Sequence, residues 1–91
     1  MDKNNGNGIK KAEVRYEKIL PGQFSDENIV VIRSISGFLT MILPSFFINE
    51  SKKTIKVAIV AEESERYLVN LPNDTFTTGA RVWFPKSEIL V

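Results

Sequence analysis

Neither cysteine nor histidine occurs among the 91 residues of this chain. Without cysteine the chain cannot form disulfides, use a thiolate or build a cysteine-based zinc site. Without histidine it lacks the commonest general base and the favoured neutral metal ligand. We therefore expect no metal site and no cofactor, and a protein that is not an enzyme.

The chain also lacks a large net charge of either sign and a long apolar run. Twelve Lys and Arg against eleven Asp and Glu leave a net charge of +1, too little to attract phosphate backbones or anionic membranes over a distance. No apolar run approaches the ~20 residues that span a bilayer. The first residues, Met1 to Asn5, lack the apolar core of a secretory signal. We expect a cytoplasmic protein with no membrane partner.

Length and composition predict a single small domain. A chain of this size buries only roughly 60–65% of its unfolded surface, so a second core is excluded. The apolar fraction of 43% and the charged fraction of 25% are typical of globular proteins. Asparagine and glycine dominate the start of the chain, which predicts a disordered tail over residues 1–9 and one domain over residues 10–91.

Short alternating apolar segments predict an all-β fold. Residues 29–35 are dense in β-branched side chains, and residues 54–61 alternate cleanly between apolar and other residues. With turns every eight to twelve residues, the pattern favours a small five- or six-stranded antiparallel barrel. Two hairpins are expected, over 29–43 and 54–71, and residues 72–79 are expected to form a loop. The lone aromatics Phe24 and Phe76 are expected to tuck against the barrel.

Each proline follows a large apolar residue at the end of a candidate strand. The segments around Pro44 and Pro85 also look alike, because each passes through polar residues, one after Pro44 and three after Pro85, to an apolar stretch. One interpretation is a weak internal repeat of strand, proline corner and strand. The other is that proline simply ends strands, as in any β protein. Residues 85–88 are long enough for one 3₁₀ turn before a last strand.

The ending of the chain, from Val82 to Leu90, reads Val-Trp-Phe-Pro-Lys-Ser-Glu-Ile-Leu. It resembles the closing segment of Src-homology-3-like small barrels, where a strand passes through a proline into a 3₁₀ turn and a short strand. It is also similar to the Trp-x-Pro-Lys-Ser ending of small phage and bacterial proteins of uncharacterised function. The opening Ala-Leu-Tyr-Asp-Tyr stretch of Src-homology-3 domains has no counterpart, so the resemblance implies the barrel and not the binding of proline-rich peptides.

Two kinds of binding residue stand out. Single-stranded nucleic acid could stack on aromatics that neighbour basic residues; the candidates are Arg15, Tyr16, Arg66, Tyr67, Arg81, Trp83 and Lys86. The alternative for this set is that Trp83 is buried and Arg81 pairs with a glutamate. The lysines at 10, 11, 52, 53 and 56 form short basic clusters, which usually mark a solvated loop or a tail.

A protein interface is the second possibility. Phe38, Leu39, Phe46 and Phe47 put more apolar bulk in the first hairpin than one small barrel needs. Alternatively, Phe46 and Phe47 fill the core from a capping turn. The carboxylates lie in polar turns, where they suit solubility better than acid catalysis. We therefore expect a non-catalytic interaction module that binds a protein partner or itself as a homodimer; the alternative is a single-stranded nucleic-acid binder.

Overall fold

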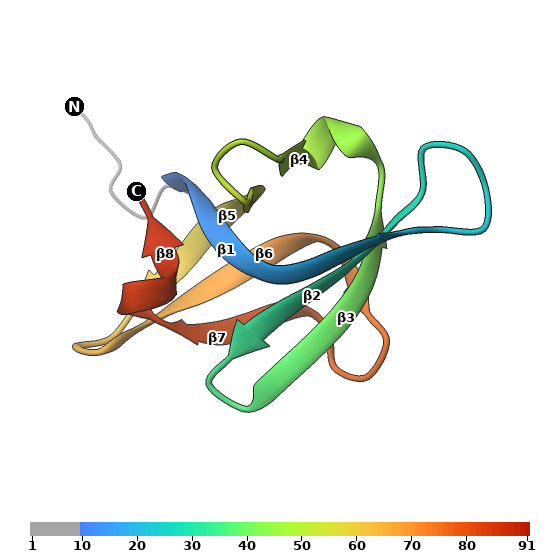
Figure 1. Ribbon diagram of the computed structural model, residues 1–91. Coiled ribbons are helices and arrows are strands. Elements are labelled where there is room, and N and C mark those ends of the chain that lie inside the picture. The colour runs from blue at the N-terminus through green and yellow to red at the C-terminus, as the bar shows by residue number, and fades with distance from the viewer. Residues whose placement is uncertain (1–9) are drawn as a thin grey trace.

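The structure is a computed structural model that describes residues 10–91. Over these residues the chain is nearly all β, with an antiparallel sheet curled into a half-barrel (Figure 1). The predicted small all-β fold and its 3₁₀ turn after Pro85 are confirmed. The predicted disordered tail, residues 1–9, lies outside the described residues.

The described residues form eight strands and two 3₁₀ turns. In chain order they are β1 (Lys10–Pro21), β2 (Asn28–Ser34), β3 (Gly37–Leu43), η2 (Ser45–Phe47), β4 (Ile48–Asn49), β5 (Thr54–Glu62), β6 (Arg66–Thr75), β7 (Gly79–Pro85), η3 (Lys86–Glu88) and β8 (Ile89–Leu90). The six longer strands lie in the order β3-β2-β1-β5-β6-β7, while β4 pairs with β5 and β8 pairs with β1.

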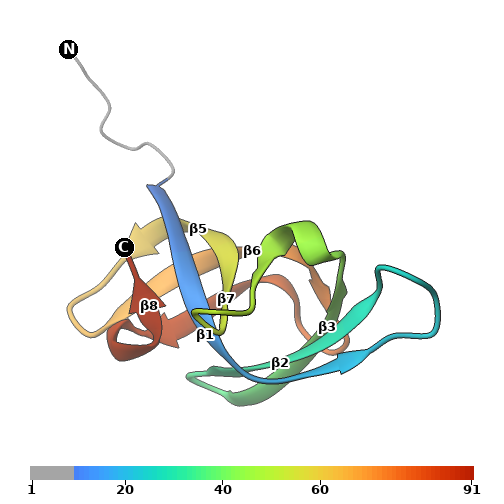
Figure 2. The same cartoon turned by 45° about the horizontal axis from the view of Figure 1, so that its top comes forward.

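Strand β1 belongs to both parts of the curled sheet. Residues 10–15 pair with β5, and residues 16–21 pair with β2. The register shifts between Tyr16 and Lys18, which marks a bulge, and bulges bend a strand and increase its twist. The two parts of the sheet can therefore face each other across the core (Figure 2).

One cluster of buried apolar side chains fills the space inside the curled sheet. Alternation along each strand supplies it, because successive residues of a strand point to opposite faces. Val14 of β1 and Ile55 of β5 are paired and fully buried at its centre, and Leu43 and Phe84 are fully buried at the ends of β3 and β7. The β-branched and aromatic residues that predicted strands are thus the ones that build the core.

The two halves of the chain are related by a pseudo-two-fold axis that passes between Val14 and Ile55. On either side of that pair Glu13 faces Lys56 and Arg15 faces Thr54, which is the register of a pseudo-two-fold axis. The flanking short strands obey the same relation: β4 places Ile48 opposite Ile55, and β8 places Ile89 opposite Val14. Residues 10–49 and residues 54–90 are therefore two halves with the same order of elements.

The two proline corners show the repeat most clearly. Pro44 before η2 has φ −71° and ψ 157°, and Pro85 before η3 has φ −62° and ψ 143°. Ile48 and Ile89, which end the two turns, also share one backbone conformation, with φ −111° and −110°. The structure therefore supports the interpretation of the sequence as a repeat of strand, proline corner and strand.

Hydrogen bonds between the two halves draw the outer strands together. The Ile35 N–H, in the turn between β2 and β3, donates to the Trp83 carbonyl of β7 at 3.1 Å. The Phe76 N–H, after β6, donates to the Thr40 carbonyl of β3 at 2.9 Å. These contacts hold the edges of the half-barrel toward each other, so the edge strands are partly covered.

Three local predictions were wrong. Phe24 and Phe76 do not tuck against the barrel, because their side chains are 66% and 63% exposed. Residues 72–75 belong to β6 and are not loop; Pro72 lies inside that strand, within the shift of register between Asn70 and Thr75. A proline is tolerated there because no ladder hydrogen bond is required at an irregular position.

Candidate functional site

A groove of about 710 Å³ crosses the outer face of β1, β5 and β6. Its volume lies within the range of roughly 300–1,000 Å³ that ligand sites occupy. We call this surface the groove, and the side chains that line it are Lys11, Ala12, Glu13, Phe46, Phe47, Lys52, Lys56, Val57, Ala58, Asn70, Leu71, Pro72, Leu90 and Val91.

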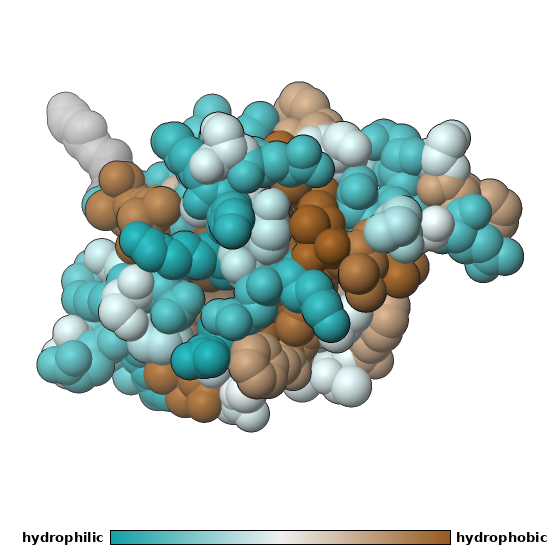
Figure 3. Space-filling model, viewed as in Figure 1, coloured by the Kyte–Doolittle hydropathy of each residue, from teal (hydrophilic) through white to brown (hydrophobic). Residues whose placement is uncertain are grey.

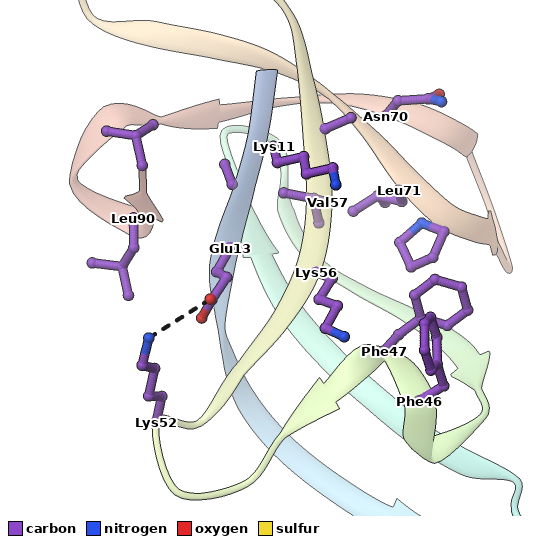
Figure 4. Close-up of a pocket in the computed structure, with 14 residues that line it drawn as sticks. Lys11, Glu13, Phe46, Phe47, Lys52, Lys56, Val57, Asn70, Leu71 and Leu90 are labelled. Atoms are coloured by element: carbon purple, nitrogen blue, oxygen red, sulfur yellow. Dashed lines mark ion pairs between the residues drawn. The ribbon is translucent and has the colours of Figure 1, made fainter. Parts of the chain in front are cut away.

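Apolar residues form the two walls of the groove. Figure 4 shows Phe46 and Phe47, from η2, on one side of β1 and β5 and Leu90, from β8, on the other. The two phenylalanine rings pack edge to face with centroids 5.1 Å apart, which holds both in place. Phe46 remains 71% exposed and Val91 76% exposed. Both walls therefore offer apolar surface to an occupant.

Basic side chains lie between the walls. Lys11 and Lys56 project from neighbouring strands in the middle of the groove, and Lys52 rises from the loop before β5 (Figure 4). The Lys56 ammonium sits 4.3 Å from the centroid of the Phe46 ring, a cation–π contact that aligns the lysine with the wall. Three lysines and one glutamate line the groove, so it carries an excess of positive charge.

Glu13 is already engaged within the fold. One of its carboxylate oxygens accepts a hydrogen bond from the hydroxyl of buried Thr54 at 2.5 Å. The other lies 3.7 Å from the ammonium of Lys52. The Glu13 carboxylate therefore interacts with Thr54 and Lys52. It does not neutralise Lys11 and Lys56, whose positive charges line the groove.

Trp83 and Arg81, two residues of the predicted stacking site, lie on one face of β7. Trp83 is half-buried on the outer face of β7, so it is neither a core residue nor a fully exposed one. The Arg66 guanidinium, from β6, covers its ring at 4.0 Å from the centroid, and the same guanidinium is held by Glu63 at 2.7 Å. Arg81 is exposed on the same face of β7. The pairing with glutamate that was considered for Arg81 is thus made by Arg66.

The other predicted aromatic and basic neighbours are separated. Tyr67 follows Arg66 in β6 and turns to the other face, where it packs on the core and lies 5.0 Å from the Lys86 ammonium. Arg15 is exposed, while Tyr16 packs on the core. Burial, and then the nearby Glu50 carboxylate, raise the pKa of the Tyr16 hydroxyl. Strand alternation separates each of these pairs, so they do not form one binding surface.

The predicted interface residues lie in three different parts of the fold. Phe38 is 60% exposed on the outer face of β3, with the Arg33 guanidinium 5.1 Å from its ring centroid. Leu39 is buried in the core and is unavailable to a partner. Phe46 belongs to the groove, and Phe47 joins the groove to the core, which it partly covers. Phe47 thus partly fills the core, as one alternative for η2 predicted, whereas Phe46 does not; the interface at Phe46 stays a prediction.

Two carboxylates of the described residues, Asp26 and Glu62, have shifted pKa values. Within residues 10–91 no three acidic side chains are grouped so that they could hold a metal ion. Hydrogen bonds from Ser45 lower the pKa of Asp26, and a hydrogen bond and the charge of Lys86 lower the pKa of Glu62. A general acid needs the opposite shift.

The groove was not predicted from the sequence. Its lysines were assigned to a solvated loop and a tail, because nothing in the local pattern shows that residues 11 and 56 lie on adjacent strands. The one available signal was alternation in residues 54–61, which places Lys56 and Ala58 on the face opposite the core. The pairing of β1 with β5 and the position of η2 supplied the rest.

Comparison of this chain with protein families, with curated proteins and with solved structures found no match. The resemblance of residues 82–90 to Src-homology-3-like barrels therefore stays a prediction. Within residues 10–91 no helix is long and apolar enough to cross a bilayer. The cytoplasmic location also stays a prediction.

Proposed function

We propose that this protein is a non-catalytic interaction module that binds, in the groove, a segment of a protein partner with apolar and acidic side chains. The observation that carries the proposal is the arrangement of lysines between two exposed apolar walls. Binding sites in proteins are mostly apolar, with a few polar groups that fix the orientation of the ligand. The groove has this composition.

The walls would supply most of the affinity. Exposed aromatic side chains in concave sites are the usual anchors of protein interfaces, because burial of a ring removes a large apolar area from water. Phe46 is the most exposed phenylalanine of the described residues, at 71%. Its edge-to-face contact with Phe47 limits its motion, so little conformational entropy is lost on binding.

The lysines would supply the preference for acidic partners. Lys11 and Lys56 stand on adjacent strands, so carboxylates on one bound segment could face both. Complementary charge speeds association and excludes partners of like charge more than it adds affinity. An apolar segment without carboxylates would therefore bind more weakly, and a basic segment would be rejected.

Two observations favour a protein partner over a single nucleic-acid strand. At Trp83 the ring face that a base would use is covered by Arg66, which Glu63 holds in place. In the groove the two rings are nearly perpendicular, at 83°, and the opposite wall is aliphatic, so successive bases would have no row of stacking faces. Single-stranded DNA is nevertheless included in the test.

The test is fluorescence anisotropy with three labelled probes: a short peptide in which Glu alternates with Leu, its Lys–Leu counterpart, and oligothymidine. We expect saturable binding of the acidic peptide only, weakened by salt because the lysine contribution is screened. Salt-sensitive binding of oligothymidine in place of the peptide would establish the nucleic-acid alternative. If neither the acidic peptide nor oligothymidine binds, the groove is refuted as a docking site.

The pseudo-two-fold axis offers a matched pair of variants. Lys56 and Arg15 occupy equivalent outer positions beside the Val14–Ile55 pair, but only Lys56 lines the groove. Lys56→Glu should lower the affinity for the acidic peptide about tenfold, which corresponds to about 1.4 kcal/mol. Arg15→Glu makes the same change in net charge and should leave the affinity within about twofold. Equal losses in both variants would mean that overall charge, not the groove, drives binding.

A further inference from the structure

The loop between β1 and β2, residues 22–27, projects from the barrel in both ribbon views (Figures 1 and 2). It carries Phe24, whose side chain is 66% exposed. Figure 3 shows apolar residues gathered on the surface next to this projection, on a face that is otherwise largely hydrophilic. A large aromatic side chain on a projecting loop has the form of an anchor for another molecule.

Hydrogen bonds make this loop a defined structure. The Gly22 N–H donates to the Glu27 carbonyl at 2.7 Å, and the Glu27 N–H donates to the Phe24 carbonyl at 3.2 Å. The Phe24 N–H donates to the Glu27 side-chain carboxylate at 3.1 Å. A Cβ on Gly22 would lie 2.5 Å from the Glu27 Cβ, so this close approach requires glycine.

A further bond joins the loop to the wall of the groove. The Ser45 N–H, at the start of η2, donates to the Asp26 side-chain carboxylate at 3.0 Å. Asp26 adopts a positive φ of 62°, which aspartate tolerates better than most residues. The loop is thereby fixed beside η2, and in both views it extends away from the barrel (Figures 1 and 2). None of its residues lines the groove of its own molecule.

The loop and the groove are complementary in chemistry. The loop presents one exposed aromatic ring with the carboxylates of Asp26 and Glu27 two and three residues beyond it. The groove presents apolar walls with Lys11 and Lys56 between them. The hydrogen bonds that Asp26 accepts from Ser45 favour its ionised form, so its charge is present at neutral pH.

We propose that a second copy of this chain occupies the groove, with Phe24 between the phenylalanine wall and Leu90 and with the loop carboxylates facing Lys11 and Lys56. This inference rests on the proposed function, for which it names the partner. Because the loop and the groove meet at η2, one two-fold axis can place each loop in the other molecule's groove. Such a reciprocal exchange closes the assembly as a dimer.

The experiment is analytical ultracentrifugation of the full chain over a wide range of concentration. We expect a reversible dimer for the wild type and a monomer for Phe24→Ser and for Lys56→Glu. Phe76→Ser is the matched control, because it removes an equally exposed phenylalanine from another loop and should leave the dimer intact. Circular dichroism establishes that each variant is folded. A wild type that stays monomeric, or a dimer that survives Phe24→Ser, would overturn the proposal.

Mixing the two monomeric variants makes the test specific. Phe24→Ser keeps an intact groove and Lys56→Glu keeps an intact loop, so the mixture regains one of the two contacts. We expect a weak heterodimer that neither variant forms alone, and a mixture that remains monomeric would count against the exchange of loops.

Peptide binding separates the two proposals. In Phe24→Ser no loop competes for the groove, so the acidic peptide should bind at least as tightly as to the wild type. If the wild type is a strict monomer that still binds the peptide, the self-association is wrong and the proposed function stands. If the wild type dimerises but the dimer and the peptide do not compete, the loop does not occupy the groove.

Discussion

The two proline corners follow nearly the same backbone path and present opposite chemistry. In the first half the turn η2 carries Phe46 and Phe47 beside the outer face of β5. In the second half the turn η3 carries Ser87 and Glu88 at the corresponding positions. The backbone of the repeat is therefore independent of these side chains, and their replacement decides which corner borders the groove.

The surfaces beside the two corners differ in the same way. The groove faces Lys56 and Ala58, and its far wall is Leu90 and Val91. At the pseudo-equivalent surface of the first half, Glu17 pairs with Arg33 at 3.8 Å. The groove also contains an ion pair, between Lys52 and Glu13 at 3.7 Å, so what distinguishes it is the apolar walls, and the following experiments test that contrast.

The largest effects are expected in the shared core. Leu43 and Phe84 are equivalent residues before the two prolines, and both are fully buried. Phe84→Ala should lower the free energy of unfolding by about 3–5 kcal/mol and Leu43→Ala by about 2–5 kcal/mol. Because one cluster contains both, urea unfolding should stay a single transition in each variant. Two separate transitions would show that the halves fold independently.

A large effect on binding, with little effect on stability, is expected at η2. Phe46 and Ser87 are equivalent residues of η2 and η3. The variant Phe46→Ser therefore gives the first corner the serine of the second. The acidic peptide should then bind at least about tenfold more weakly, since an aromatic anchor is lost. The melting temperature should barely change, because Phe46 is 71% exposed.

Phe38→Ser is the control for this change, since Phe38 is 60% exposed but lies outside the groove. Its peptide affinity should match that of the wild type. An unchanged affinity in Phe46→Ser would remove η2 from the binding site.

A smaller effect is expected where the connections of the two halves differ. The first half has the projecting loop of residues 22–27, and the second has a short acidic turn before Arg66. Gly22→Ala should distort the projecting loop, because the new Cβ would meet Glu27 at 2.5 Å. We expect a loss of about 1–3 kcal/mol in the free energy of unfolding, measured with urea. Ser25→Ala, at an exposed position of the same loop, serves as the control substitution.

The smallest effect is expected from the charges at the corners. Asp26 accepts the Ser45 N–H after Pro44, and Glu62 pairs with the Lys86 ammonium after Pro85. Lys86 lowers the pKa of Glu62 from its ordinary value of 4.5. This contribution to stability is present above that value and is lost as the pH falls through the lowered pKa.

Lys86→Gln should therefore reduce the urea midpoint slightly at neutral pH, and the difference from the wild type should shrink as the solution is acidified below the ordinary pKa of glutamate. The same interaction raises the pKa of Lys86, so its contribution is present at neutral pH and is lost only as the pH rises through that raised value. High salt should weaken this pair, which is largely exposed, more than the Asp26 hydrogen bond. A constant difference at every pH would contradict the ion pair.

The strands were predictable because their signals are local. Residues 29–34 and 54–61 lie in strands, as their β-branched side chains and alternation predicted, while Ile35 lies in the turn after β2 and is 50% exposed. The turn after Pro85 was predictable for the same reason, since proline sets the conformation of its neighbours. The burial of Phe24 and Phe76 was not predictable, because it depends on whether segments distant in the chain pack over them.

The sequence by itself determined the all-β fold, the positions of the proline corners and the absence of histidine and cysteine chemistry, since each depends on composition or on neighbouring residues. Only the tertiary structure decided which residues meet. Alternation sends Tyr16 and Tyr67 to the core side while Arg15 and Arg66 point outward. The pairing of β1 with β5 brings Lys11 near Lys56, and η2 adds Phe46 as a wall. Contacts between residues so far apart in the chain depend on the register of the whole sheet, which no local pattern specifies.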